Sequence, residues 1–134
     1  ALADLEGGAG AVVTASGMGA VSLVTQLFKP DQVAVVPHDC YGGTYRLFNA
    51  LNLRGALQVR FVDFQDAAAL NAAIADKPAL VWIETPSNPL LRIVDVAAVA
   101  ARAKAAGASA KAGCAGACIA QAADSARCEG RPIW

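Results

Sequence analysis

The sequence has few histidines, no net charge and, near its end, very few branched apolar side chains. Its 134 residues contain one histidine, so no histidine-rich metal site can form and no Ser-His-Asp triad can be built without His38. Lysine plus arginine and aspartate plus glutamate each number 11, and no basic stripe is present. This balance argues against nucleic acid and anionic membranes as partners.

The sequence shows no targeting segment, membrane span or metal motif. No positive region precedes an apolar core at the N-terminus, and the apolar stretches are broken by Gly, Ser, Thr or Gln. The spacing of Cys114, Cys118 and Cys128 does not match a structural zinc site, so no metal is expected. We therefore expect a soluble cytoplasmic protein with reduced thiols.

Apolar runs and helix caps alternate along residues 1–108. Ser16, Asp66 and Asp95 are good N-caps, each ahead of apolar residues at helical spacing, and a further helix follows the loop after residue 36. This alternation predicts an α/β fold with a mostly parallel sheet covered by helices on both faces. The N-terminal residues 1–8 look like the last turn of another helix, and buried strands are expected at 9–14, 33–36, 58–62 and 79–83.

The composition changes after residue 108. Residues 1–108 contain 32 Val, Leu, Ile or Phe, whereas residues 109–134 contain only Ile119 and Ile133. So few branched apolar side chains should not supply another buried strand. We therefore divide the chain into a partial domain over residues 1–108 and a tail over 109–134, which is out of frame, artificial or disordered.

Two segments lie where a strand or loop leads into a helix. Ser16 precedes Gly17 and Met18, whose free N–H groups at a helix start suit a phosphate, although a plain N-cap is an equal alternative. Tyr41 stands in a polar loop beside two glycines, which allow a ligand to approach the backbone. The alternative there is a turn with a half-buried tyrosine.

A third segment, Glu84-Thr-Pro-Ser-Asn-Pro, follows the predicted strand at 79–83. It places a carboxylate and the amide of Asn88 at the carboxyl end of a strand, where open α/β sheets bind ligands. The alternative is an Asx-type turn in which Glu84 is solvated.

Together and in this order, the three segments resemble the Cys/Met-metabolism family of pyridoxal-phosphate enzymes, over residues 1–108. The resemblance implies part of the large cofactor domain of a type I pyridoxal-phosphate transferase, with pyridoxal 5'-phosphate as cofactor. It implies amino-acid substrates, a homotetramer for the full-length parent, and formation of cystathionine from O-succinylhomoserine and cysteine in methionine biosynthesis. An O-acylhomoserine sulfhydrylase or a cystathionine lyase of the same family stays open.

The resemblance assigns cofactor roles by position. The N–H groups of Gly17 and Met18 would bind the cofactor phosphate, and Tyr41 would stack on the pyridine ring and accept a proton from the incoming amino group. Asn88 would donate a hydrogen bond to the phenolic oxygen of the cofactor, with Glu84 nearby.

The resemblance also implies that Arg46 binds the distal carboxylate of the substrate, because the N–H donors of a guanidinium match the two oxygens of a carboxylate. Two family features are missing. The aspartate that pairs with the pyridinium nitrogen should fall near position 113, where the chain has Gly113. The Schiff-base lysine should fall past Trp134, so these 134 residues alone are expected to be catalytically inactive.

Overall fold

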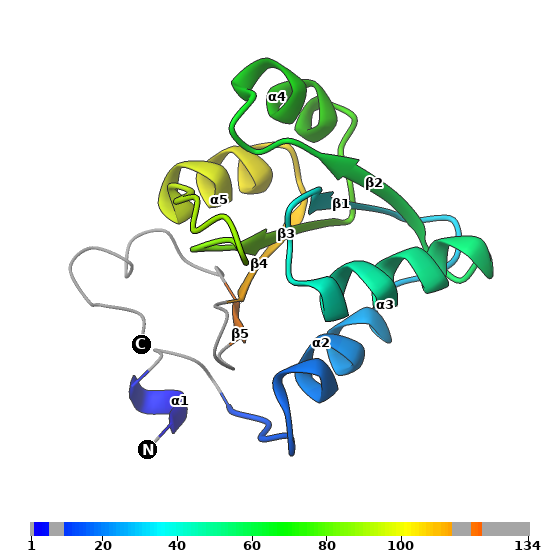
Figure 1. Cartoon of the computed structure of the whole chain (residues 1–134), viewed down its shortest axis with the longest axis vertical. Helices are drawn as coiled ribbons and strands as arrows, with labels where there is room; N and C mark the ends of the chain where they lie inside the picture. Colours follow the sequence, from blue (N-terminus) through cyan, green and yellow to red (C-terminus); the bar gives the residue numbers. More distant parts are fainter. Residues whose placement is uncertain (1, 6–9, 114–118, 122–134) are drawn as a thin grey trace.

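Strands and helices alternate along the chain as the caps and apolar runs in the sequence require (Figure 1). The computed structural model describes residues 2–5, 10–113 and 119–121. Its helices are α1 (Leu2–Leu5), α2 (Gly17–Thr25), α3 (Gly42–Leu53), α4 (Ala67–Ala75) and α5 (Val96–Ala105). Its strands are β1 (Val33–Pro37), β2 (Gln58–Val62), β3 (Leu80–Glu84), β4 (Ser109–Gly113) and β5 (Ile119–Gln121).

The five strands form one sheet in the order β2-β1-β3-β4-β5. Strand β1 pairs in parallel with β2 and β3, and β3 pairs in parallel with β4, whereas β5 runs antiparallel to β4. The predicted α/β class with a mostly parallel sheet is therefore confirmed. Because β1, β2, β3 and β4 are parallel, their carboxyl ends meet at one edge of the sheet.

Each face of the sheet is covered by a pair of helices, α2 and α3 on one side and α4 and α5 on the other (Figure 1). Alternate residues of a strand point to opposite faces. Val35 and Ile83 accordingly pack in one core cluster with side chains of α4 and α5. Val36 and Trp82 pack in the other with side chains of α2 and α3, among them the fully buried Phe48.

The helix ends agree with the sequence. The side chains of Ser16, Asp66 and Asp95 each accept a hydrogen bond from a backbone N–H in the first turn of α2, α4 and α5. Gly55 and Gly107 follow the ends of α3 and α5 with φ of 66° and 83°, values that favour glycine.

The predicted buried strand over residues 9–14 is wrong for its described part. Residues 10–14 form no strand, and Val12 and Val13 are 77% and 76% exposed. Only these two branched residues supported the prediction, and within the described part of the chain no strand of the sheet pairs with them. Without a neighbour to accept its backbone hydrogen bonds, such a short run gains nothing from being extended.

A strand does follow residue 108, because β4 extends the sheet beside β3. The division of the chain at residue 108 stays a prediction. The sheet ladder is made by backbone N–H and C=O groups, so a run of Ser, Ala, Lys and Gly can form it without branched side chains. Residues 114–118 and 122–134, the rest of the predicted tail, lie outside the described residues.

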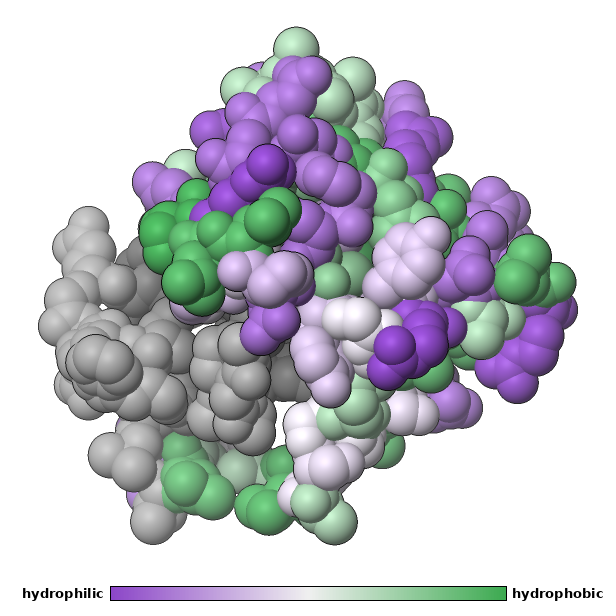
Figure 2. Space-filling view, viewed as in Figure 1, coloured by the Kyte–Doolittle hydropathy of each residue, from purple (hydrophilic) through white to green (hydrophobic). Residues whose placement is uncertain are grey.

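Exposed apolar side chains gather on the loop between β3 and α5. Figure 2 shows them as a green patch left of centre, and they comprise Leu90, Leu91 and Ile93, which are 55%, 69% and 70% exposed. In the described ranges, every helix is too short or too polar to cross a membrane. The patch lies on the loop that leaves the carboxyl end of β3.

Two leucines of α3 test the core assignment. Leu51 is 7% exposed and packs on Phe48 and Trp82 in one cluster, whereas Leu53 on the same helix is 78% exposed. We expect Leu51→Ala to lower the free energy of unfolding by about 2–5 kcal/mol through transfer and cavity terms, and Leu53→Ala by less than about 0.5 kcal/mol. Urea denaturation followed by circular dichroism measures both, and equal losses would contradict this packing.

Candidate functional site

The candidate site lies at the carboxyl edge of the sheet, where the loops after β1, β2 and β3 leave it. Ligands of open α/β sheets bind at this edge. Strand β1 leads into the loop that carries Tyr41, and β3 leads into the loop that carries Asn88. Two of the three predicted segments therefore lie at one edge because their strands are parallel neighbours.

The start of α2 presents two backbone donors. Ser16 Oγ accepts from Gly19 N at 3.1 Å, and the Ser16 carbonyl accepts from Ala20 N at 3.1 Å. The N–H groups of Gly17 and Met18 precede any intrahelical acceptor, and no acceptor for them lies among the described residues. With the positive end of the helix dipole behind them, they form a site suited to an anion.

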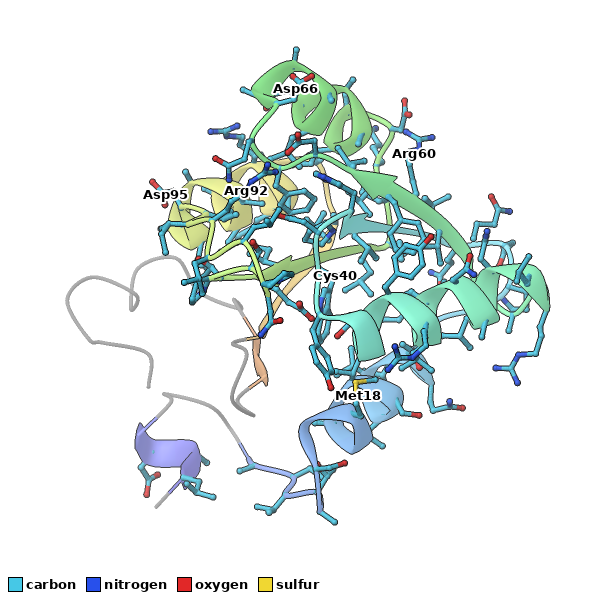
Figure 3. The ribbon with its side chains drawn as sticks, viewed as in Figure 1. Met18, Cys40, Arg60, Asp66, Arg92 and Asp95 are labelled. Atoms are coloured by element: carbon cyan, nitrogen blue, oxygen red, sulfur yellow. The ribbon has the colours of Figure 1, made fainter. Side chains whose placement is uncertain are left out.

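Met18 and Tyr41 meet over Gly43. A methyl group placed on Gly43 would lie 2.5 Å from Tyr41 Cε1 and 2.9 Å from Met18 Sδ, so both side chains rest directly on this glycine. Figure 3 shows Met18 at the start of α2, beside the N-terminal end of α3. Gly43 therefore brings the start of α2 and the Tyr41 ring, which is 46% exposed, into one place.

Glu84, the last residue of β3, is the polar centre of the site. Its Oε2 accepts from the backbone N–H of Tyr41 at 2.6 Å. Its Oε1 accepts from Thr44 Oγ1 at 2.7 Å and from Trp82 Nε1 at 3.1 Å. Glu84 is only 7% exposed, and Thr44 and Trp82 are each 1% exposed. This carboxylate thus ties the end of β3 to the loop that carries Tyr41 and to the first turn of α3.

Cys40 lies beside Tyr41 in the chain, in the core cluster beneath the loop. It is 6% exposed. Burial first, and then the negative charge of Glu84, raises the pKa of its thiol from 9.0 to about 12. The thiol is therefore protonated and unreactive at neutral pH, which argues for a packing role.

A second set of polar side chains, Arg92, Asp39, Asp63 and His38, crosses the same edge. Arg92 Nη1 lies 3.8 Å from Asp39 Oδ2 and 3.9 Å from Asp63 Oδ1, and His38 Nδ1 lies 3.9 Å from the same Asp63 oxygen. These pairs join the loops after β1, β2 and β3. Every pair has at least one side chain that is 40–45% exposed, although Asp39 is only 12% exposed. At 3.8–3.9 Å, solvent screening leaves each pair worth about 0–1 kcal/mol.

The structure brings most of the predicted site residues together. Met18 and Tyr41 share Gly43, and the Tyr41 backbone binds Glu84. Arg46 is exposed on α3, and its Nη1 lies 3.4 Å from the position of a methyl group on Gly42. Asn88 lies four residues after Glu84 and is exposed. Among the described residues, its side chain makes no hydrogen bond to another predicted site residue.

Position 113, where the resemblance expects an aspartate, also belongs to this edge. Gly113 ends β4 and is paired in register with Glu84 of β3. A side chain at this position would therefore start from the same edge as the loops of the site. The chain has no carboxylate to offer there.

Sequence reasoning missed Thr44 and Trp82, both of which bind Glu84. A signal for Trp82 exists, because residues two apart in a strand share a face and a buried indole N–H requires an acceptor. The Thr44 contact joins residues 40 apart in sequence, and nothing local indicates it.

Taken alone, the fold and the site define an α/β domain with backbone N–H groups at a helix start, a half-exposed tyrosine and a buried carboxylate at the carboxyl edge of its sheet. Comparison with known proteins identifies the family. The model of the Cys/Met metabolism PLP-dependent enzymes matches residues 1–112. The chain belongs to this family, whose cofactor is pyridoxal 5'-phosphate.

Among curated relatives, the cystathionine gamma-synthase of Escherichia coli (strain K12) is 61% identical over 100 residues, which are 74% of this chain and 26% of the relative. The cystathionine beta-lyase of Coxiella burnetii is 44% identical over 104 residues, 77% of this chain and 27% of that protein. The chain thus spans about a quarter of the length of these relatives.

Solved structures agree. The crystal structure of cystathionine gamma synthase from Xanthomonas oryzae pv. oryzae in complex with aminoacrylate and cysteine superposes with a TM-score of 0.80 at 50% identity. The match covers 83% of this chain and 29% of that chain. A cystathionine gamma-lyase from Micromonospora echinospora superposes with a TM-score of 0.75 at 43% identity, covering 83% and 29%.

The residues present fit the family cofactor. A phosphate ester needs backbone donors, which the start of α2 leaves available at Gly17 and Met18. A pyridine ring needs a flat partner, and the Tyr41 ring is half-exposed beside Met18. Near the position where the resemblance expects a carboxylate for the pyridinium nitrogen, the chain carries Gly113.

Adjacent glycines at the start of α3 test the packing of Tyr41. In Gly43→Ala the new methyl group would collide with the Tyr41 ring and Met18, whereas in Gly42→Ala it would meet only the flexible end of Arg46 at 3.4 Å. We expect Gly43→Ala to lower the free energy of unfolding by about 1–3 kcal/mol and to shift the Tyr41 ring resonances. Gly42→Ala should be neutral or stabilise the helix by up to about 1 kcal/mol. Urea denaturation and NMR measure both variants, and indistinguishable spectra would refute the close packing on Gly43.

The buried thiol gives a test that depends on pH. The unfolded chain loses the Cys40 proton above pH 9.0 and the folded chain only near pH 12, so stability falls as pH rises between these values. In Cys40→Ala this part of the fall should disappear. At pH 8, iodoacetamide should modify Cys40 at least about tenfold faster in denaturant than in the folded chain, by peptide mass mapping. Equal rates would show that the thiol is accessible.

Proposed function

We propose that this chain forms part of the cofactor site of an enzyme that makes cystathionine from O-succinylhomoserine and cysteine by γ-replacement. The observation that carries the proposal is the meeting of Met18 and Tyr41 over Gly43, beside the open start of α2. The named synthase from Escherichia coli, 61% identical, supports the reaction. Exposed Arg46 supplies a cation for the distal carboxylate of such a substrate.

In this proposal Gly17, Met18, Tyr41 and Asn88 each contact the cofactor or the substrate. The N–H groups of Gly17 and Met18 bind the cofactor phosphate, and the Tyr41 ring stacks on the pyridine. The Tyr41 side chain acts as its phenolate, which takes a proton from the substrate ammonium group and becomes the phenol, and Asn88 donates to the phenolic oxygen of the cofactor. The cofactor, when bound, supplies the electron sink of the reaction, and the protein orients the substrate around it.

A lyase is the second candidate, because relatives named beta-lyase and gamma-lyase are 44% and 39% identical to the chain. Arg46 is the residue that favours the synthase, since a substrate with a distal carboxylate needs a partner for it. We further propose that the 134 residues alone do not turn over substrate, because position 113 lacks the expected carboxylate and no lysine matches the family's Schiff-base position.

Binding of pyridoxal 5'-phosphate tests the proposal on the chain itself. Tyr41 and Tyr45 are 46% and 42% exposed, but only Tyr41 lies over Gly43, while the Tyr45 ring packs 4.6 Å from that of Phe61. We expect Tyr41→Ala to weaken binding about two- to tenfold through lost stacking and Tyr45→Ala to leave it unchanged, by equilibrium dialysis. Equal effects of the two variants, or no binding to the unaltered chain, would rule the proposal out.

Turnover separates the candidate activities from an incomplete site. The chain is incubated with the cofactor and with O-succinylhomoserine plus cysteine, or with cystathionine alone, and products are measured by mass spectrometry. We expect no product and no single lysine fixed by borohydride. Cystathionine formed from the first mixture would show an active synthase, and cleavage of cystathionine a lyase; either would contradict the incompleteness of the site.

A further inference from the structure

Within the part of the chain that the structure describes, the backbone N–H of Tyr41 has one acceptor, the Oε2 of Glu84 at 2.6 Å. Tyr41 is the residue before the first turn of α3, and its own side chain makes no capping hydrogen bond. The Tyr41 carbonyl accepts from Tyr45 N at 2.9 Å in the first turn of α3. Outside that helix, Tyr41 is held by the Glu84 carboxylate and by the packing of its ring on Gly43. The ring itself is half-exposed and has no hydrogen bond that would fix it from the solvent side in the described structure.

We propose that Glu84 is a positioning residue that sets the place of Tyr41 for the cofactor ring, an inference that rests on the proposed function of Tyr41. The carboxylate is buried, and both oxygens are already bound by protein donors. It therefore acts through Tyr41 and makes no contact with the cofactor. The charge and both oxygens are needed because the Tyr41 N–H and the Trp82 Nε1–H can only donate.

The donor pattern predicts what Glu84→Gln does. An amide has one acceptor oxygen, so its NH₂ group must face either the Tyr41 N–H or the Trp82 N–H. Thr44 adapts, because its hydroxyl can accept as well as donate. The indole is more deeply buried, so the amide oxygen turns to Trp82 and the Tyr41 N–H loses its acceptor.

Removing the competing donor, the Trp82 N–H, should restore the hydrogen bond of the Tyr41 N–H. In Trp82→Phe the carboxylate keeps its bonds to Tyr41 and Thr44, and a phenyl ring preserves an aromatic contact with Phe48. In the double variant Trp82→Phe/Glu84→Gln, the amide oxygen can accept from Tyr41 while its NH₂ donates to Thr44 Oγ1. A residue with a merely structural role would give the opposite order, because the double variant carries two core substitutions.

The experiment measures amide hydrogen exchange of Tyr41 by NMR in the 134-residue chain, relative to the core amide of Val35. We expect Glu84→Gln to speed Tyr41 exchange about tenfold or more. Trp82→Phe and the double variant should stay within about threefold of the unaltered chain. Unchanged exchange in Glu84→Gln, or exchange in the double variant as fast as in Glu84→Gln, would overturn the proposal.

Two further results keep the inference separate from the proposed function. If Glu84→Gln does not fold, the comparison of the double variant with Trp82→Phe decides, and faster Tyr41 exchange in the double variant overturns the proposal. Equilibrium dialysis with pyridoxal 5'-phosphate should follow the same order, with weaker binding to Glu84→Gln and recovery in the double variant. The expected exchange pattern in a chain that binds no pyridoxal 5'-phosphate would refute the proposed function and support the positioning of Tyr41.

Discussion

The arrangement of the site depends on one buried carboxylate. Glu84 ends β3 and accepts hydrogen bonds from the Tyr41 backbone, Thr44 and Trp82, so a strand, a loop and the first turn of α3 share one acceptor group. Leaving a buried donor without a partner costs about 1–3 kcal/mol. Loss of the carboxylate would leave two N–H groups, those of the Tyr41 backbone and the Trp82 indole, without an acceptor. Among the described residues, no other side-chain hydrogen bond joins β3 to the loop that carries Tyr41.

The other polar contacts of the edge are weaker and serve a different purpose. The pairs of Arg92 with Asp39 and Asp63 are long and partly solvated, so each contributes about 0–1 kcal/mol. They join loops, whereas Glu84 fixes one backbone atom. Packing supplies the remaining constraint, because the glycine at position 43 lets Met18 and the Tyr41 ring close on α3. A rigid rim with a half-exposed aromatic ring is what a flat, phosphorylated cofactor of this family requires.

Much of the fold and part of the candidate site could be predicted from the sequence. Caps at Ser16, Asp66 and Asp95 and the apolar runs of β1, β2 and β3 are local signals, and the structure confirms them. The strand expected at 9–14 was wrong, and β4 was not anticipated, because strand pairing depends on distant backbone partners. The three hydrogen bonds of Glu84 were not predicted for a related reason. Two of them join residues that are 43 and 40 apart in sequence. The alternative interpretation of the third segment, a turn with a solvated Glu84, is excluded because Glu84 is buried.

The central claim is that the carboxyl edge of this sheet is shaped to receive pyridoxal 5'-phosphate at Gly17, Met18 and Tyr41. The most direct measurement is an NMR titration of the ¹⁵N-labelled chain with the cofactor, with amide shifts mapped on the structure. The account predicts that the largest changes fall on those three amides and on their neighbours at the starts of α2 and α3. Changes concentrated at the opposite edge, around Gln32 and Ala79 where β1 and β3 begin, would contradict it.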